Sequence, residues 1–303
     1  MGIRQSAWSN HLNAAEVFAS YERVRHRLPT AKLGPACKNI PNLDALADEI
    51  DVFLLDAFGV LNIGDTAIEG VPERVARLQK IGKRVVVVSN AAGFPHAKLM
   101  EKYNRLGYDF APEDVITSRK ATLHALQNAP PLRWGLMATK SLGRGDIEPF
   151  DMVYLVEDAV AYDSVDAFLL LGSAEWSEER QTLLEVTLKN LPRPVYVGNP
   201  DMVAPREGGF SIEPGHFAHR LADRTSVEPQ FFGKPFGNIF DLAFSHLGNI
   251  DLGRTVMVGD SLHTDILGGQ AAGLKTALVA GYGFFAGQDV EAPIAASGIR
   301  PDY

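Results

Sequence analysis

The stretch that decides the fold is DVFLLDAFGVLNIG, residues 51–64, in which an apolar run ends at Asp56 and the chain then turns at a glycine. An apolar run without polar alternation is typical of a parallel strand that is covered on both faces of its sheet. Three other segments share this pattern, namely RVVVVSN (84–90), TVMVGD (255–260) and KTALVAG (275–281). The sequence therefore predicts a parallel sheet in a protein of the α/β class.

Helical patterns separate these strands. Val71, Val75 and Leu78 recur at helical spacing with Pro72 near the start, and residues 239–247 repeat the pattern behind an expected N-cap at Asn238. Strands that alternate with helices predict a doubly wound sheet, whose right-handed crossovers bring the carboxyl ends of the strands to one edge. Residues 14–28 predict a further amphipathic helix that packs on the body of the protein.

The middle of the chain contains a second set of such patterns. Strands are predicted over 133–139, 151–157, 166–172 and 194–199, with a helix over 178–190. A chain of 303 residues is long for one domain. We therefore expect a smaller α/β domain, residues 124–229, inserted into a core of residues 46–123 and 230–303, with an N-terminal extension over residues 1–45.

Polar side chains follow three strands of the predicted core, and ligands of open parallel sheets bind outside the carboxyl ends of the strands. A carboxylate placed there can attack phosphorus and form an acyl phosphate that water hydrolyses. Mg²⁺, which prefers oxygen ligands, would neutralise the charge between two such carboxylates. A serine, backbone N–H groups and a lysine would hold the phosphoryl oxygens. The residues expected to meet at this edge are Asp56, Ser89, Asn90, Lys234, Asp260 and Asp265.

Each of these residues also has a simpler interpretation. Asp56 could form a turn, Lys234 lies in a loop rich in glycine and proline, and Asp260 and Asp265 could place charge at the start of a helix. Their compatible order along the chain, all at one edge of the sheet, favours a functional site.

The order DAFGVL (56–61), VVVVSN (85–90), GKP (233–235) and GDSLHTDI (259–266) resembles the haloacid dehalogenase (HAD) superfamily, and its last two motifs resemble class IIA, which includes sugar and p-nitrophenyl phosphatases. The resemblance covers about residues 50–285 and implies a Rossmann-like core with a C2-type cap domain. It implies that Asp56 is the nucleophile and that Asp56, the carbonyl group of Phe58 and Asp260 bind Mg²⁺, with Asp265 supporting that site. It further implies that Ser89 and Lys234 bind the phosphoryl group, and it makes Asn199 and Asp201, beside Asn90, candidates for substrate binding.

Phe58 departs from this resemblance, because phosphatases of the superfamily usually carry an aspartate at that position as the acid for the leaving group. Loss of such an acid typically lowers the rate by about 10² to 10⁴. Three interpretations stay open: a Mg²⁺-dependent phosphatase of a small phosphate ester, a haloacid dehalogenase, and a catalytically weakened relative with a binding or regulatory role. Metal-free dehalogenases lack the GD pair that ends at Asp260, which favours the phosphatase.

The bulk composition limits the partners. A formal net charge of −8 gives no basic surface for nucleic acid or an anionic membrane, and 46% apolar with 22% charged residues is ordinary for a globular protein. The single cysteine, Cys37, cannot form an internal disulfide, and no apolar run is long enough to span a membrane. We therefore expect a cytoplasmic hydrolase, with a homodimer as an open alternative to a monomer.

Overall fold

The computed structural model describes residues 13–30, 36–206 and 209–303. Of the expected N-terminal extension, residues 1–12 and 31–35 lie outside the described residues. Within the described part of the chain, no helix is long and apolar enough to cross a membrane.

The first of two large sheets contains all four strands predicted from the apolar runs. Its strand order is β14-β13-β1-β4-β5, and each neighbouring pair is parallel. The strands are β1 (Val52–Leu55), β4 (Arg84–Ser89), β5 (Val115–Thr117), β13 (Thr255–Gly259) and β14 (Lys275–Leu278). The short strand β5 was not predicted.

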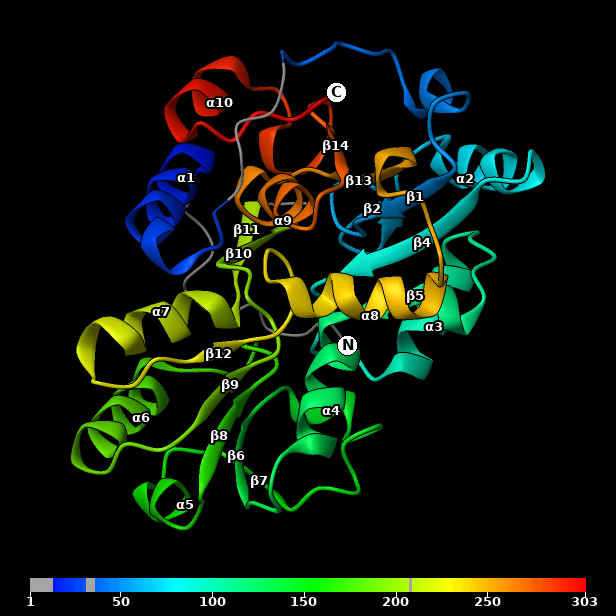
Figure 1. Cartoon of the computed structure of the whole chain (residues 1–303). Helices are drawn as coiled ribbons and strands as arrows, with labels where there is room; N and C mark the ends of the chain where they lie inside the picture. Colours follow the sequence, from blue (N-terminus) through cyan, green and yellow to red (C-terminus); the bar gives the residue numbers. More distant parts are fainter. Residues whose placement is uncertain (1–12, 31–35, 207–208) are drawn as a thin grey trace.

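Helices cover both faces of this sheet, as a doubly wound fold requires (Figure 1). Phe53 and Leu55 of β1 pack with α2 and α3, whereas the alternate residues Val52 and Leu54 pack with α4 and α8. The helices of this part are α2 (Val71–Lys80), α3 (His96–Arg105), α4 (Ser118–Asn128), α8 (Gly237–Leu247), α9 (Leu267–Ala271) and α10 (Glu291–Ser297). Both faces are thus buried, which explains the unbroken apolar runs.

The N-cap expected at Asn238 was wrong. Helix α8 begins at Gly237, and its N-cap residue Phe236 makes no side-chain capping bond. Asn238 instead accepts a hydrogen bond from the Gly233 N–H (2.9 Å) and donates one to the Phe231 carbonyl (2.8 Å), so its side chain holds the preceding loop.

The middle of the chain forms a second parallel sheet with the order β12-β9-β8-β6-β7. Its strands are β6 (Trp134–Met137), β7 (Met152–Tyr154), β8 (Ala167–Leu170), β9 (Val195–Val197) and β12 (Gln230–Phe231), and its helices are α5 (Ala159–Asp163), α6 (Glu178–Asn190) and α7 (Pro214–Arg224). This confirms an α/β core with an inserted α/β cap. The residue boundaries given above stay a prediction, and β12 pairs with the second sheet.

Smaller elements connect these layers. Two antiparallel hairpins are formed by β2 (Asn62–Ile63) with β3 (Thr66–Ala67) and by β10 (Val203–Arg206) with β11 (Gly209–Ile212). A π-helical turn, η6 (Leu262–Ile266), follows β13. Short 3₁₀ turns are η1 (Arg25–Arg27), η2 (Leu43–Leu46), η3 (Pro112–Asp114), η4 (Lys140–Leu142), η5 (Leu252–Arg254) and η7 (Gly283–Phe285).

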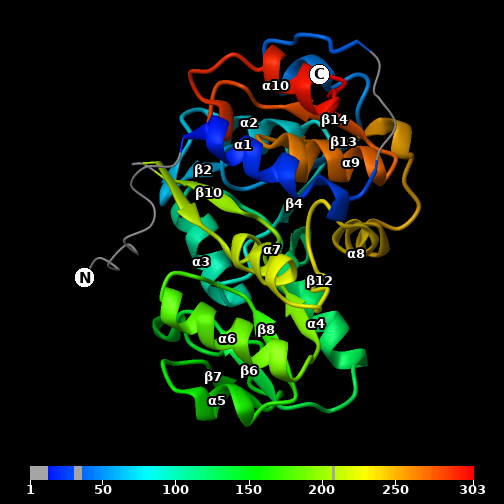
Figure 2. The ribbon, with the colours of Figure 1, turned by 90° about the vertical axis from the view of Figure 1, so that its left-hand side faces the viewer.

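Helix α1 (Ala14–Arg23) lies beside the core near α9 and α10 and approaches α7 of the cap in both views (Figures 1 and 2). A capping box between Asn13 and Glu16 closes its first turn. Its buried face, which includes Val17 and Tyr21, belongs to the same apolar cluster as Met202 and Phe284. The predicted amphipathic helix thus packs on the body of the protein.

Candidate active site

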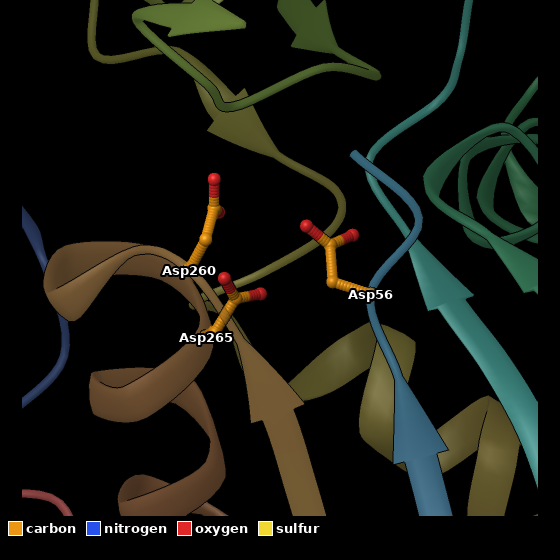
Figure 3. A group of neighbouring side chains, drawn as sticks. All are labelled: Asp56, Asp260 and Asp265. Carbon is orange, nitrogen blue, oxygen red and sulfur yellow. The ribbon is translucent and has the colours of Figure 1, made fainter. Parts of the chain in front are cut away.

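Three carboxylates meet at the carboxyl edge of the first sheet. Asp56 directly follows β1, Asp260 follows the neighbouring strand β13, and Asp265 lies one turn further in η6. One oxygen from each lies within 4.8 Å of the others, and Figure 3 shows the three groups around a common space. The parallel pairing of β1 with β13 explains how residues so distant in sequence come together.

Two glycines make room for Asp260. Gly59 and Gly283 have φ values of +79° and +69°, and a Cβ atom at either position would overlap the Asp260 carboxylate. The Phe284 N–H, next to Gly283, donates to Asp260 Oδ2 at 2.7 Å. The orientation of Asp260 is therefore fixed by two loops: the one with Gly59 belongs to the DAFGVL motif, whereas the one with Gly283 and Phe284 was not predicted to contact the site.

Lys234 is the cation of this group. Its ammonium donates to Asp56 Oδ1 and to Asp265 Oδ1, each at 2.6 Å, and its side chain is 2% exposed. Asp265 also accepts the Ser261 N–H at 3.1 Å and is fully buried, so it holds Lys234 beside Asp56. Burial alone would lower the pKa of Lys234, but the surrounding carboxylates of Asp265, Asp56 and Asp201 raise it above its usual range.

The carboxylates carry more negative charge than Lys234 balances. Burial raises the pKa of Asp56 to about 7, against the lowering effect of Lys234. Burial and the charges of Asp265 and Asp56 also raise the pKa of Asp260 well above its usual range. Buried, converging carboxylate oxygens are the donor set of a hard divalent cation, and such an ion would relieve this repulsion. The side chains present therefore fit a divalent metal ion.

Asn90 connects three segments at the same edge. Its Nδ2 donates to Asp201 Oδ1 (2.8 Å) and to the Lys234 carbonyl (2.9 Å), and its Oδ1 accepts the Lys234 N–H (2.8 Å). Both ends of its amide are thus used to hold the Lys234 loop and the Asp201 segment in place. Ser89 is buried and its Oγ accepts the Ala91 N–H at 3.3 Å.

The Asn199–Asp201 segment lies where the cap meets the core. Asn199 accepts the Asp201 N–H at 3.0 Å and donates to Glu213 Oε2 at 3.1 Å. Burial raises the pKa of Asp201 to about 8, although Lys234 and Asn90 oppose this shift. Asn199 therefore shapes the turn that brings Asp201 to the active-site edge.

A pocket of about 360 Å³ contains these groups and extends between the two sheets. Its lining includes Asp56, Ser89, Asn90, Asn199, Asp201 and Asp260. Side chains of the core, of the β10–β11 hairpin and of helix α1 complete its wall. Lys234 and Asp265 do not line this surface: Lys234 contacts the lining residue Asp56, and Asp265 contacts Lys234.

Comparison with known proteins identifies the family. A family model described as haloacid dehalogenase-like hydrolase matches residues 53–142, and one described as HAD-hydrolase-like matches residues 231–303. Glycerol-3-phosphate phosphatase of Gallus gallus is 31% identical over 266 residues, which cover 81% of this chain and 85% of that protein. The chain belongs to the haloacid dehalogenase-like hydrolases.

Solved structures share the fold of this haloacid dehalogenase-like hydrolase. A HAD-superfamily protein from Cytophaga hutchinsonii superposes with a TM-score of 0.77 at 24% identity, covering 88% of this chain and 96% of its own. A 4-nitrophenylphosphatase from Thermotoga maritima gives 0.68 at 25% identity, covering 85% and 94%. These findings confirm the predicted superfamily, its class IIA and the prediction of a hydrolase.

Phe58 occupies an unexpected environment in this haloacid dehalogenase-like hydrolase. The Lys102 ammonium lies 4.8 Å from the centre of its ring and the Arg206 guanidinium 5.1 Å from it. Lys102 comes from α3 of the core and Arg206 from the β10–β11 hairpin, and all three line the pocket. Neither cation was predicted from the sequence, because no local motif marks them.

Proposed function

We propose that the chain is a Mg²⁺-dependent phosphatase that hydrolyses a small-molecule phosphate monoester, such as a sugar phosphate, through an aspartyl phosphate on Asp56. The observation that carries the proposal is the position of Asp56, which faces Asp260 and contacts Lys234 at the inner end of a pocket of about 360 Å³. A pocket of this size suits a small molecule.

Asp56 would act as the nucleophile. Its carboxylate oxygen forms a bond to phosphorus while the bond from phosphorus to the ester oxygen breaks, and water then hydrolyses the acyl phosphate. Lys234 opposes the rise in the pKa of Asp56 that burial causes and balances the incoming negative charge, and Asp265 holds that ammonium in place. Ser89 and the backbone N–H groups after β4 would bind phosphoryl oxygens, with Asn90 fixing the Asp201 segment and Lys234 around them.

The Mg²⁺ ion would be held by Asp56, Asp260 and the Phe58 carbonyl, with Asp265 supporting the site. When bound, the ion would neutralise the phosphoryl oxygens and so permit attack by an anion. The three converging carboxylates support this assignment, and they disfavour a haloacid dehalogenase, whose chemistry needs no metal.

The leaving group needs a proton, and Phe58 cannot supply it. Esters with good leaving groups, such as aryl or acyl phosphates, should therefore react faster than alkyl phosphates. The two cations beside the ring would stabilise an oxyanion that leaves on that side. The presence of Phe58 in place of an acid also favours the second candidate function, that of a catalytically weakened relative with a binding or regulatory role.

A panel of phosphate esters, assayed with Mg²⁺ and with a chelator and including one haloacid, tests the proposal. The expected result is Mg²⁺-dependent phosphate release from at least one ester and no halide release. Asp56→Asn should abolish turnover and preserve the fold. Halide release would support the dehalogenase, and Mg²⁺ binding without turnover on any ester would support the weakened relative. A cytoplasmic location and a homodimer stay predictions.

A further inference from the structure

Helix α1 lies outside the matched family segments, which begin at residue 53, yet it reaches the active-site pocket. Its buried residues pack against Met202 of the cap junction and Phe284 of the loop that contacts Asp260. Beyond the helix, Arg27 forms an ion pair with Asp223 of α7 at 2.7 Å. This N-terminal segment therefore contacts both the core and the cap beside the site.

Tyr21 is the residue of α1 that lines the pocket, and it is 3% exposed. Its ring stacks on His263 with centroids 4.9 Å apart and an interplanar angle of 7°. His263 belongs to η6, the turn that carries Asp265, and its Nε2 contacts Glu22 Oε1 at 2.5 Å. The Tyr21 ring is thus held on one face by η6, the turn that also carries Asp265 of the carboxylate cluster.

The hydroxyl group of Tyr21 is held from a second direction. The Met202 N–H, next to Asp201, donates to its Oη at 3.0 Å. This bond uses one lone pair of the hydroxyl oxygen, and the O–H group can still donate a hydrogen bond of its own. Among residues 13–30, 36–206 and 209–303, no group accepts that hydrogen bond. Tyr21 lines the pocket together with Asp201 and Asp260, and its hydroxyl is bonded to the residue that follows Asp201.

Burial and these carboxylates raise the pKa of Tyr21 well above its ordinary value. The hydroxyl therefore keeps its proton throughout the working pH range and is a donor, not an acid. A buried donor without a protein acceptor that lines a ligand pocket is suited to a hydrogen bond with the ligand.

We propose that Tyr21 is a substrate-binding residue, contributed by the N-terminal extension, whose hydroxyl donates a hydrogen bond to an oxygen of the bound phosphoryl group. The inference rests on the proposed function, because it requires that the inner end of the pocket binds phosphate. It assigns the N-terminal helix to the active site, in addition to its packing role.

Binding of inorganic phosphate in the presence of Mg²⁺, measured by calorimetry, tests the inference without turnover. Tyr21→Phe keeps the ring and its stacking on His263 but removes the donor. We expect its Kd for phosphate to rise about 10-fold or more, as for the loss of one hydrogen bond to a charged acceptor. The KM for p-nitrophenyl phosphate should rise by a similar factor, with a smaller change in kcat.

Phe18→Leu is the matched control, since Phe18 contacts the same His263 ring edge-on (5.2 Å, 66°) from the same helix but does not line the pocket. It should lower the melting temperature and leave phosphate affinity unchanged. The inference is overturned if Tyr21→Phe binds phosphate as tightly as the wild type, or if both variants weaken it equally. Phosphate binding without hydrolysis of any ester would instead contradict the proposed function alone.

Discussion

Lys234→Met should destabilise the metal-free protein severely. Lys234 and its partner Asp265 have side-chain exposures of 2% and 0%, and Asp56 has 13%, so removal of the ammonium leaves buried carboxylates without their cation. Removing one partner of a buried ion pair costs about 3–5 kcal/mol. For a domain of this size, 1 kcal/mol corresponds to roughly 2–4 °C, so the melting temperature should fall by roughly 6–20 °C.

Lys102→Met provides the matched control. The Lys102 side chain is 6% exposed, but its partner Asp65 is 80% exposed, so the substitution leaves no buried carboxylate without its cation. The Gly64 carbonyl that Lys102 contacts at 2.8 Å keeps its hydrogen bond from Asn62 Nδ2. The expected cost is about 0–1 kcal/mol, as for an exposed ion pair.

Thermal unfolding of both variants and the wild type, followed by circular dichroism at about pH 7.5 with a chelator, measures the two falls in melting temperature. If the balance of buried charge determines the cost, the melting temperature falls clearly further for Lys234→Met than for Lys102→Met. Equal falls would refute this explanation, because burial of the lysine stem would then determine the cost.

Three further substitutions test the site. Gly283→Ala should weaken Mg²⁺ binding measured by calorimetry, because its Cβ would displace Asp260, whereas Gly287→Ala, also at positive φ but facing open space, should only lower stability by about 1 kcal/mol; equal Mg²⁺ affinity in both would contradict the role of the Gly283 approach. Burial raises the pKa of Asp201 from its ordinary 3.8 to about 8. Between these pH values the folded state binds more protons than the unfolded state, so the contribution of Asp201 to the free energy of unfolding falls as pH rises. The melting temperature of Asp201→Asn minus that of the wild type, both without metal, should therefore rise between about pH 5 and about pH 8. A constant difference would count against the raised pKa. Phe58→Asp should raise kcat/KM on alkyl phosphates, by up to about 10²-fold, more than on aryl phosphates; equal gains would show that proton donation was not limiting.

The sequence predicted the elements whose pattern is local. The apolar runs before Asp56 and Asp260 gave the central strands, because residues covered on both faces leave a continuous apolar signal. Helix α6 has the predicted limits, Glu178–Asn190. The meeting of Asp56 with Asp260 followed from topology, since neighbouring parallel strands end at one edge.

The remaining features depend on contacts between distant segments. Tyr21 bonds to Met202, 181 residues away, and no spacing in the sequence relates the two. Arg206 reaches Phe58 only because the hairpin from the cap lies over the core. At Asn238, the local pattern of a helix cap competed with a loop contact to Gly233, and the loop contact prevailed. Side-chain partners of this kind require the packed structure.

Trapping the acyl phosphate tests the central claim most directly. The enzyme would be mixed with Mg²⁺ and p-nitrophenyl phosphate, quenched in acid, reduced with borohydride and analysed by peptide mass spectrometry. An aspartyl phosphate on Asp56 predicts conversion of Asp56 alone to homoserine, dependent on both substrate and Mg²⁺. Turnover with Asp56 unmodified, or with the label on Asp260, would contradict the account.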